Sequence, residues 1–377
     1  SFQPFTAKRY SLIGADGKTH ELTSDQFDFG SGNTCQIRGL TDPPAANKGA
    51  TLIATIKKQK PKAKEKIRNR VKSVVVNYSK DAASGVGTTT LNDGLTYGSY
   101  PYGTRVQDKN ISINDADIIE VLAIYESADT SDASAPKVTL SSIVTQSTTT
   151  NELIIGEQLV GQSSGAVAMV AEKPSDSIIS VIYQNEHLFK EGETVNFQES
   201  GSNAIVSALN SPSFDISPNF KFIDGQQATI YNIGSILRKS DSDSPSKKIR
   251  IYYSNGSFDG SDNGDFITAN SYNQYDYGID IPKINGVSNA DIIDIRPRAS
   301  QVSSVSEGDR SPLEFKGRSF NASGNAAPNI LASDETLLID YSFYLGRIDR
   351  IFLSKEGKFQ VKYGDPSEDP QKPVPVD

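Results

Sequence analysis

The chain has 377 residues, 36% of them hydrophobic and 22% charged, and a formal net charge of −8. It contains no Trp, one Cys, one Met and two His. This composition excludes a disulfide framework, a Cys/His zinc site and a c-type haem attachment, while the length predicts roughly two to four domains.

No feature predicts a membrane span or a secretion signal. The most apolar stretches, such as Val121–Tyr125, are far shorter than the roughly 20 residues that a span requires. The N-terminus lacks the basic start and apolar middle of a signal peptide. The single Cys suits a cytosolic protein or any assembly that does not rely on disulfides. Because the first residue is Ser1 and the C-terminal end is rich in Pro, we expect a piece of a longer protein.

The local pattern predicts a mainly β protein. Short runs rich in Val, Ile, Thr, Tyr and Phe are separated by Gly-containing turns, and helical periodicity is scarce. We expect several domains of β-sandwich or barrel-like type. Residues 1–56 form the first β segment, in which Asp16-Gly17 joins Tyr10–Ile13 to Thr19–Leu22 as a hairpin.

Residues 57–72 form a basic tract, which we expect to be an extended arm. It holds nine Lys or Arg and one Glu, a net charge of +8 that leaves −16 on the rest of the chain. The cations at even positions are Lys58, Lys60, Lys62, Lys64, Lys66, Arg68, Arg70 and Lys72. In an extended strand these side chains project from one face, and Pro61 favours an edge strand or arm over a central strand.

Three interpretations of this basic tract remain open. The cations can form a solvated edge that blocks association between sheets. They can also bind an acidic neighbouring subunit, which makes the even-numbered cations our candidate partner-binding residues. Nucleic acid is disfavoured as the partner, because no aromatic residue interleaves the cations and the remaining chain repels phosphate.

An internal repeat predicts a small β-module over residues 136–210. Gly156-Glu157 followed by Ser164-Gly165 matches Gly192-Glu193 followed by Ser200-Gly201 at the same spacing. Two similar strand signatures, Ala116–Val121 and Ala290–Ile295, flank this module. We therefore expect the module to be inserted into a larger, discontinuous β-domain formed by residues 73–135 and 211–330.

The C-terminal part predicts a strand-hairpin region followed by a linker. Within residues 331–364, Arg347–Ser354 and Lys358–Tyr363 flank a Lys-Glu-Gly turn and predict a hairpin. Ala332–Tyr344 suits a helix or a strand equally well. Residues 365–377 carry several Pro and predict an extended linker.

The sequence offers little equipment for catalysis. His20 and His187 both lie near predicted turns, and neither they nor Cys35 lie in a nucleophile motif. Acidic residues are numerous and scattered, so no carboxylate pair stands out. Asp259–Asp265 has oxygen donors at calcium-loop spacing but lacks the closing Glu, which favours a simple turn. We therefore expect no enzyme activity, no bound metal and no cofactor.

A series of short motifs in fixed order runs from Asp224 to the C-terminal hairpin. The motifs are Asp224-Gly225-Gln226, Tyr231 with Gly234, Arg238-Lys239, Arg250-Ile251-Tyr252-Tyr253, Gly264-Asp265-Phe266, Asn270-Ser271-Tyr272, Asp276-Tyr277, Asp280-Ile281-Pro282, Asp291–Arg298 and Asp340–Arg350. In this order they resemble a domain of large virion structural proteins of contractile-tailed bacteriophages, particularly cyanophages. The Gly-Glu repeat is similar to small β-modules of the same proteins.

The resemblance implies a scaffold of the tail, in the baseplate or tail-fibre region, that connects or attaches fibres through protein–protein interfaces. It implies a location in the virion after assembly in the host cytoplasm, other tail proteins as partners, and a homo-oligomer, with a trimer expected. It supplies no catalytic residues. Two arginine groups, Arg296 with Arg298 and Arg347 with Arg350, are interpreted as structural anchors buried against carboxylates such as Asp294 and Asp349.

Two functions of other classes are kept as alternatives. The first is a receptor-binding adhesin that recognises host glycan through the tyrosines of Tyr97–Tyr102 and Tyr272–Tyr277, although packing accounts for such residues as well. The second is a depolymerising tailspike enzyme, which is disfavoured because the chain lacks a long solenoid repeat and an identifiable carboxylate pair.

Overall fold

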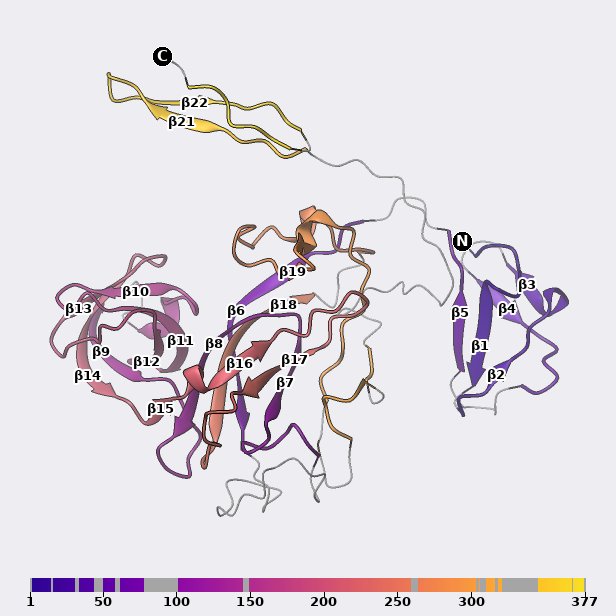
Figure 1. The fold of residues 1–377 in the computed structure, drawn as a ribbon, viewed down its shortest axis with the longest axis horizontal. Coiled ribbons are helices and arrows are strands. Elements are labelled where there is room, and N and C mark those ends of the chain that lie inside the picture. The colour runs from indigo at the N-terminus through magenta and orange to yellow at the C-terminus, as the bar shows by residue number, and fades with distance from the viewer. Residues whose placement is uncertain are drawn as a thin grey trace. The chain divides into compact units, whose positions relative to one another are not determined.

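The computed structural model describes residues 2–14, 16–30, 34–43, 50–57, 62–77, 101–144, 149–258, 264–302, 305, 310–315, 318–320, 345–367 and 369–375. Their regular elements are β-strands and short 3₁₀-helices, which confirms the predicted mainly β fold (Figure 1). None of the described segments is a helix with the length and apolarity to cross a membrane.

The chain divides into two compact units. The first comprises Ser1–Pro4, Asp28–Ile37 and Thr55–Ile330, and the second comprises Phe5–Phe27, Arg38–Ala54 and Leu331–Asp377. The predicted N-terminal hairpin is confirmed: β1 pairs with β2 across a turn in which Gly17 has a φ of 79°. β1 also pairs with β5, and β3 pairs with β4. The N-terminal elements are β1 (Tyr10–Gly14), β2 (Thr19–His20), η1 (Ser24–Gln26), β3 (Phe27–Phe29), β4 (Cys35–Ile37) and β5 (Ala50–Ala54).

The predicted C-terminal hairpin is also confirmed, as β21 (Arg350–Leu353) and β22 (Phe359–Lys362). Ile351 faces Val361 and Leu353 faces Phe359, so these four apolar side chains share one face of the hairpin. Ile351, Leu353 and Phe359 are largely solvent-exposed, and Val361 is about half exposed. The ambiguous stretch at residues 332–344 lies outside the described residues.

Two antiparallel sheets form the main core of the first unit. One has the strand order β15-β8-β18-β6, with β6 at an edge, and the other has the order β16-β17-β7. Side chains from both sheets meet in one apolar cluster that includes Ile111, Ile124, Ile236 and Ile251. The strands and the associated 3₁₀-helix are β6 (Lys66–Val76), β7 (Asn110–Ala116), β8 (Ile118–Ser127), β15 (Ser213–Asp215), η3 (Ser217–Asn219), β16 (Phe220–Ile223), β17 (Ile233–Arg238) and β18 (Ile249–Phe258).

Between β8 and β15 the chain forms a closed six-stranded barrel (Figure 1). Its strand order is β10-β11-β12-β9-β14-β13, and pairing of β13 with β10 closes the ring. The interior is filled by apolar side chains such as Leu159, Val181 and Phe197. The elements of this segment are β9 (Lys137–Val144), η2 (Thr150–Glu152), β10 (Gln158–Gly161), β11 (Val167–Ser175), β12 (Ile178–Tyr183), β13 (Thr194–Phe197) and β14 (Asn203–Asn210).

The repeated Gly-Glu motif has a reciprocal role in this barrel. Glu157 Oε2 accepts the backbone N–H of Ser200, which belongs to the Ser-Gly turn of the second copy. Glu193 Oε2 accepts the backbone N–H groups of Ser163 and Ser164 in the first copy. Each copy therefore supplies the carboxylate that satisfies the turn of the other copy.

The barrel contacts the outward face of the four-stranded sheet. Ala171 and Ile182 of the barrel share an apolar cluster with Ala123 and Tyr252 of the sheet. Arg250 Nη1 of β18 lies 2.7 Å from Glu172 Oε1 of β11. Apolar burial and an ion pair thus join the two parts.

The interpretation of Ala290–Ile295 as a strand matching Ala116–Val121 is wrong. Most of the first copy belongs to β8, but the second begins in η5 (Asn289–Asp291) and contributes one isolated bridge, between Asp294 and Ile267. Ser288 Oγ accepts the N–H of Ala290, a local cap that competes with strand pairing. The other short elements here are η4 (Ala269–Ser271), β19 (Lys283–Ile284) and β20 (Val287–Ser288).

Candidate functional site

The basic tract leads into a cluster of ion pairs at the edge strand β6. Lys58 and Lys60 lie outside the described residues. Lys62 has an exposed side chain, and its backbone N–H donates to Asp265 Oδ2 at 2.9 Å. Lys64 is buried, and its Nζ lies 5.7 Å from the centre of the Phe258 ring.

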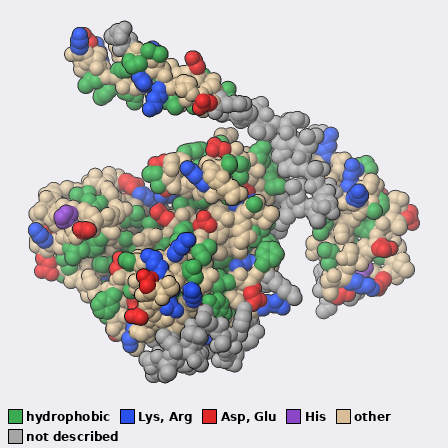
Figure 2. Space-filling view, viewed as in Figure 1, with side chains coloured by type: hydrophobic (Ala, Val, Ile, Leu, Met, Phe, Trp, Pro, Cys, Tyr) green, Lys and Arg blue, Asp and Glu red, His purple; other side chains and the backbone are tan. Residues whose placement is uncertain are grey.

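The last four cations of the tract each bind a carboxylate of this same chain. The pairs are Lys66–Asp117 at 2.6 Å, Arg68–Asp280 at 2.7 Å, Arg70–Glu199 at 2.6 Å and Lys72–Asp115 at 2.5 Å. From Lys66 onward the tract is therefore not a free arm, because hydrogen bonds to β18 build it into a sheet. On the face shown in Figure 2, basic and acidic side chains lie interspersed.

Strict alternation predicts that the even-numbered cations all project from one face of the strand. The structure differs from this prediction. Asn69 faces Asn255 and Lys72 faces Tyr253, so two residues of β6 lie opposite the single residue Ser254. This β-bulge interrupts the alternation between Arg68 and Lys72. Arg70, at the bulge, binds the barrel: its guanidinium donates to both carboxylate oxygens of Glu199.

Asp115, at the end of β7, accepts the most varied donors in the cluster. Its carboxylate binds Lys72 Nζ and Arg298 Nη2, each at 2.5 Å. It also accepts the Tyr253 hydroxyl and the Asn255 amide, each at 3.0 Å. Four donors from three different segments therefore fix the position of this buried carboxylate.

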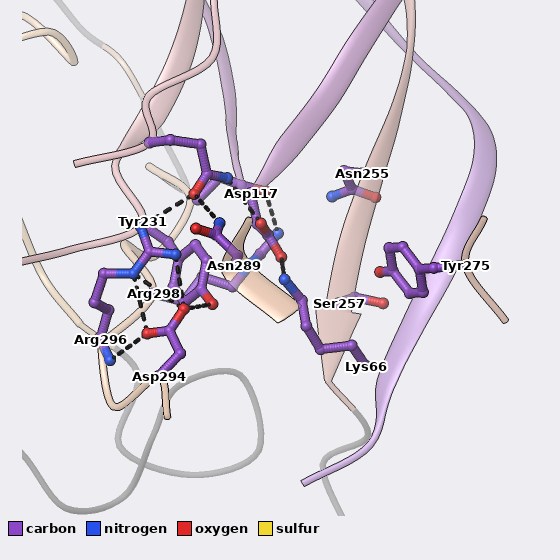
Figure 3. Close-up of polar contacts among 12 residues, drawn as sticks. Lys66, Asp117, Tyr231, Asn255, Ser257, Tyr275, Asn289, Asp294, Arg296 and Arg298 are labelled. Atoms are coloured by element: carbon purple, nitrogen blue, oxygen red, sulfur yellow. Dashed lines mark hydrogen bonds and ion pairs between the residues drawn. The ribbon is translucent and has the colours of Figure 1, made fainter. Parts of the chain in front are cut away.

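Asp117 lies in the tight connection between β7 and β8, in the left-handed region with a φ of 56°. Its Oδ2 faces Lys66 Nζ, and its Oδ1 accepts the Gln226 side-chain amide at 2.9 Å (Figure 3). Burial raises the pKa of the Asp117 carboxyl, but Lys66, Gln226 and Arg298 together lower it by more.

A second buried carboxylate, Asp294, binds Arg296 and the hydroxyl of Tyr231. Arg296 Nη2 lies 2.7 Å from Asp294 Oδ2, and the guanidinium stacks 3.9 Å from the centre of the Tyr231 ring. Arg296 Nη1 also donates to Gln226 Oε1, which links this pair to Asp117 (Figure 3). Burial, and then the adjacent Asp294, raise the pKa of Tyr231 well above its usual value, so its hydroxyl stays protonated.

The interpretation of the arginines as buried anchors is confirmed for Arg296 and Arg298, whose carboxylate partners are Asp294 and Asp115. It is wrong for Arg347. That guanidinium binds Asp349 at 2.8 Å, but both side chains are substantially exposed because the pair lies beside the two-stranded C-terminal hairpin.

The other candidate residues do not gather into a site. His20 is partly buried in β2, whereas His187 is exposed in a turn. Cys35 lies in β4, where burial and Asp28 raise the pKa of its thiol and so disfavour the reactive thiolate. Residues 259–263 of the calcium-type loop lie outside the described residues, and the described part of the chain holds no group of three or more metal-ligating side chains.

The tyrosines weighed for glycan binding divide into two groups. Tyr97 and Tyr100 lie outside the described residues. Tyr272 and Tyr275 are buried and pack edge to face, with ring centres 5.2 Å apart, while Tyr277 is about half exposed. Among the described tyrosines of Tyr272–Tyr277, most of the aromatic surface therefore serves the core.

The sequence identified the cations of this cluster and Asp294, but it did not identify Asp115, Asp117 and Gln226 as their partners. The available signal was the closely spaced pair Asp115 and Asp117, which lies immediately before the apolar strand β8. A shallow, largely apolar pocket of about 290 Å³ lies beside Asn289 and Arg296, and its wall includes Ile284 and Ile292.

Comparison of the chain with protein-family models, with curated protein sequences and with solved structures finds no match.

Proposed function

We propose that this chain is a structural component of a bacteriophage tail, in the baseplate or tail-fibre region, and works as a scaffold for attaching fibres. One observation carries the proposal. Polar residues of the motif series that resembles phage virion proteins take part in two largely buried hydrogen-bonded networks, one that includes Asp117 and Asp294 and one around Asp115. These residues are Gln226, Tyr231, Tyr253, Asp294, Arg296 and Arg298.

Such interlocking suits a scaffold better than a catalyst. A catalytic group has to reach substrate, whereas Asp294 and Arg296 are buried and use their polar atoms on each other and on neighbouring groups. Buried pairs of this kind fix how segments far apart in the sequence meet, because removing one partner leaves an uncompensated charge.

The joint between the barrel and the four-stranded sheet also supports a mechanical role. Two ion pairs, Arg70–Glu199 and Arg250–Glu172, bridge the parts beside an apolar contact. Because apolar packing and ion pairs act together at this joint, the barrel is held at more than one point.

The test is to find the chain in virus particles. Purified particles of the phage that encodes this sequence are labelled with gold-conjugated antibodies raised against the purified chain. We expect label at the distal end of the tail, and loss of fibre attachment in particles from a mutant lacking the gene. Particles that contain no such chain by mass spectrometry would refute the proposal.

A further inference from the structure

Lys66 and Asp117 form a deeply buried ion pair in the basic tract. Lys66 Nζ lies 2.6 Å from Asp117 Oδ2, and both side chains are about 1% exposed. Lys66 lies on β6, whereas Asp117 lies in the connection between β7 and β8 (Figure 3). Amine and carboxyl group are therefore brought together by the fold and not by proximity in the sequence.

Aromatic rings surround the amine. Lys66 Nζ lies 4.8 Å from the centre of the Tyr231 ring, 5.0 Å from that of Tyr272 and 5.8 Å from that of Phe258. Burial is the main cause that raises the pKa of both tyrosines, so their hydroxyls stay neutral. In such surroundings two charges are costly. Burial raises the pKa of the Asp117 carboxyl and its donors lower it by more, so the ion pair is the resting state. A transient proton transfer from the ammonium to the carboxylate removes both charges at once.

The Asp117 carboxyl group has a different neighbour at each oxygen. Asp117 Oδ1 accepts the Gln226 amide at 2.9 Å, which polarises the carboxyl group as an oxyanion-hole donor does. Among the described residues Oδ2 has no partner in hydrogen-bond geometry, although Lys66 Nζ is 2.6 Å away. Gly256 packs against the pair so closely that an added Cβ would collide with Asp117 Oδ2 and approach Lys66 Cε to 3.0 Å.

We propose that Lys66 and Asp117 form an intramolecular isopeptide bond after the chain folds. The proton moves first from the Lys66 ammonium to the Asp117 carboxylate. The neutral amine then attacks Cγ, the new C–N bond forms, and the C–Oδ2 bond breaks. The departing hydroxyl takes one proton from the nitrogen and leaves as water, so the step needs no oxidant, metal or other reactant.

Two features of the site favour the bond. Holding two reacting groups in contact replaces a bimolecular step by a unimolecular one, with effective molarities of about 10⁵–10⁸ M for well-oriented groups. The aromatic walls exclude the water that would reverse the reaction. The resulting amide would covalently join the edge strand β6 to the β7–β8 connection.

The ion pair of Lys72 with Asp115 is an internal control for Lys66–Asp117, because Lys72 lies on the same strand as Lys66, β6. Their side chains are as close, 2.5 Å apart, but Lys72 is 36% exposed. Arg298, Tyr253 and Asn255 also donate to Asp115, so three other donors compete with Lys72 for its oxygens. We therefore expect a bond at Lys66–Asp117 and none at Lys72–Asp115.

Mass spectrometry of the purified full chain under denaturing conditions tests this inference. We expect the intact mass to be lower than the sequence mass by one water. Succinimide formation at Asp-Gly sequences such as Asp224-Gly225 also removes one water, so proteolytic peptide mapping has to locate the loss. The supporting result is a branched peptide that joins Lys66 to Asp117.

Variants separate the bond from the ion pair. Lys66→Arg keeps the positive charge but cannot form a stable amide, so its mass should equal its sequence mass, whereas Lys72→Arg should still lose water. Gln226→Ala should lower the fraction of linked chain in a time course after refolding. A wild-type chain at its full sequence mass, or a branched peptide joining Lys72 to Asp115, would overturn the proposal without reference to how well any variant folds.

Discussion

Arg296 and Arg347 each bind a carboxylate two residues away, yet their surroundings differ. Arg296 is buried, stacks on Tyr231 and shares Asp294 with the hydroxyl of that ring. Arg347 binds Asp349 where water reaches both side chains. Because solvent screens exposed pairs, similar local sequence gives a strong anchor in one place and a weak contact in the other.

We predict that Arg296→Ala destabilises the first unit by about 3–5 kcal/mol, because it leaves the buried Asp294 without the cation that binds it. Urea denaturation followed by circular dichroism measures this loss. Arg347→Ala is the matched control and should leave the denaturation midpoint nearly unchanged. Equal effects of the two substitutions would contradict the role assigned to burial.

At the scale of elements, the barrel depends on reciprocal hydrogen bonds, in which a glutamate of each repeat binds backbone N–H groups of the other repeat. Burial raises the pKa of Glu193, but the N–H groups of Lys190 and Ser164 and the Ser163 and Ser164 side chains lower it by more. A carboxyl group whose pKa is lower in the folded state stabilises the fold above its unfolded pKa of about 4.5. That contribution is lost as the pH falls through the folded value.

We therefore predict that acidification below pH 4.5 selectively weakens the turn held by Glu193. Hydrogen exchange should show falling protection of the Ser164 amide, which donates to that carboxylate at 3.0 Å. Glu193→Gln should lose this protection at neutral pH and remove its pH dependence. The exposed neighbour Glu191 is the control, and Glu191→Gln should behave as the wild type does.

The residues of their turns made the two hairpins predictable. The register of β6 against β18 and the cap at Ser288 could not be predicted from the hydrophobic pattern. Asp16-Gly17 and Gly357 place a left-handed residue where each hairpin turns. The bulge in β6 is set by its partner β18, so alternation within β6 could not reveal it. The stretch Ala290–Ile295 carries a strand-like composition, but the Ser288 cap and the buried Asp294 give it a different path.

At the scale of the molecule, the candidate site is made by residues far apart in the sequence. Lys66, Asp117, Gln226 and Asp294 come from four separate segments that only the sheet topology brings together. The cations could be identified from the sequence because they recur at every second position of one tract. Their carboxylate partners lie among 46 acidic residues, and only the close pair Asp115 and Asp117 before an apolar strand offers a local signal.

The proposed oligomer leads to a prediction for the C-terminal hairpin. An isolated two-stranded hairpin is marginally stable in water, and Ile351 and Phe359 on its apolar face are 71% and 78% exposed. Burial of each such side chain against a second copy of the chain is worth about 1.5–3 kcal/mol. The double variant Ile351→Lys, Phe359→Lys should therefore dissociate the homo-oligomer.

Light scattering coupled to size-exclusion chromatography measures the mass. We expect the wild type at the mass of a multimer, a trimer in the simplest case, and the double variant at that of one chain. Gln360→Lys adds a charge to the opposite face of the same hairpin and should leave the multimer intact. A wild type that is monomeric at every concentration, or a double variant that keeps the multimer mass, would show that this face does not hold copies of the chain together.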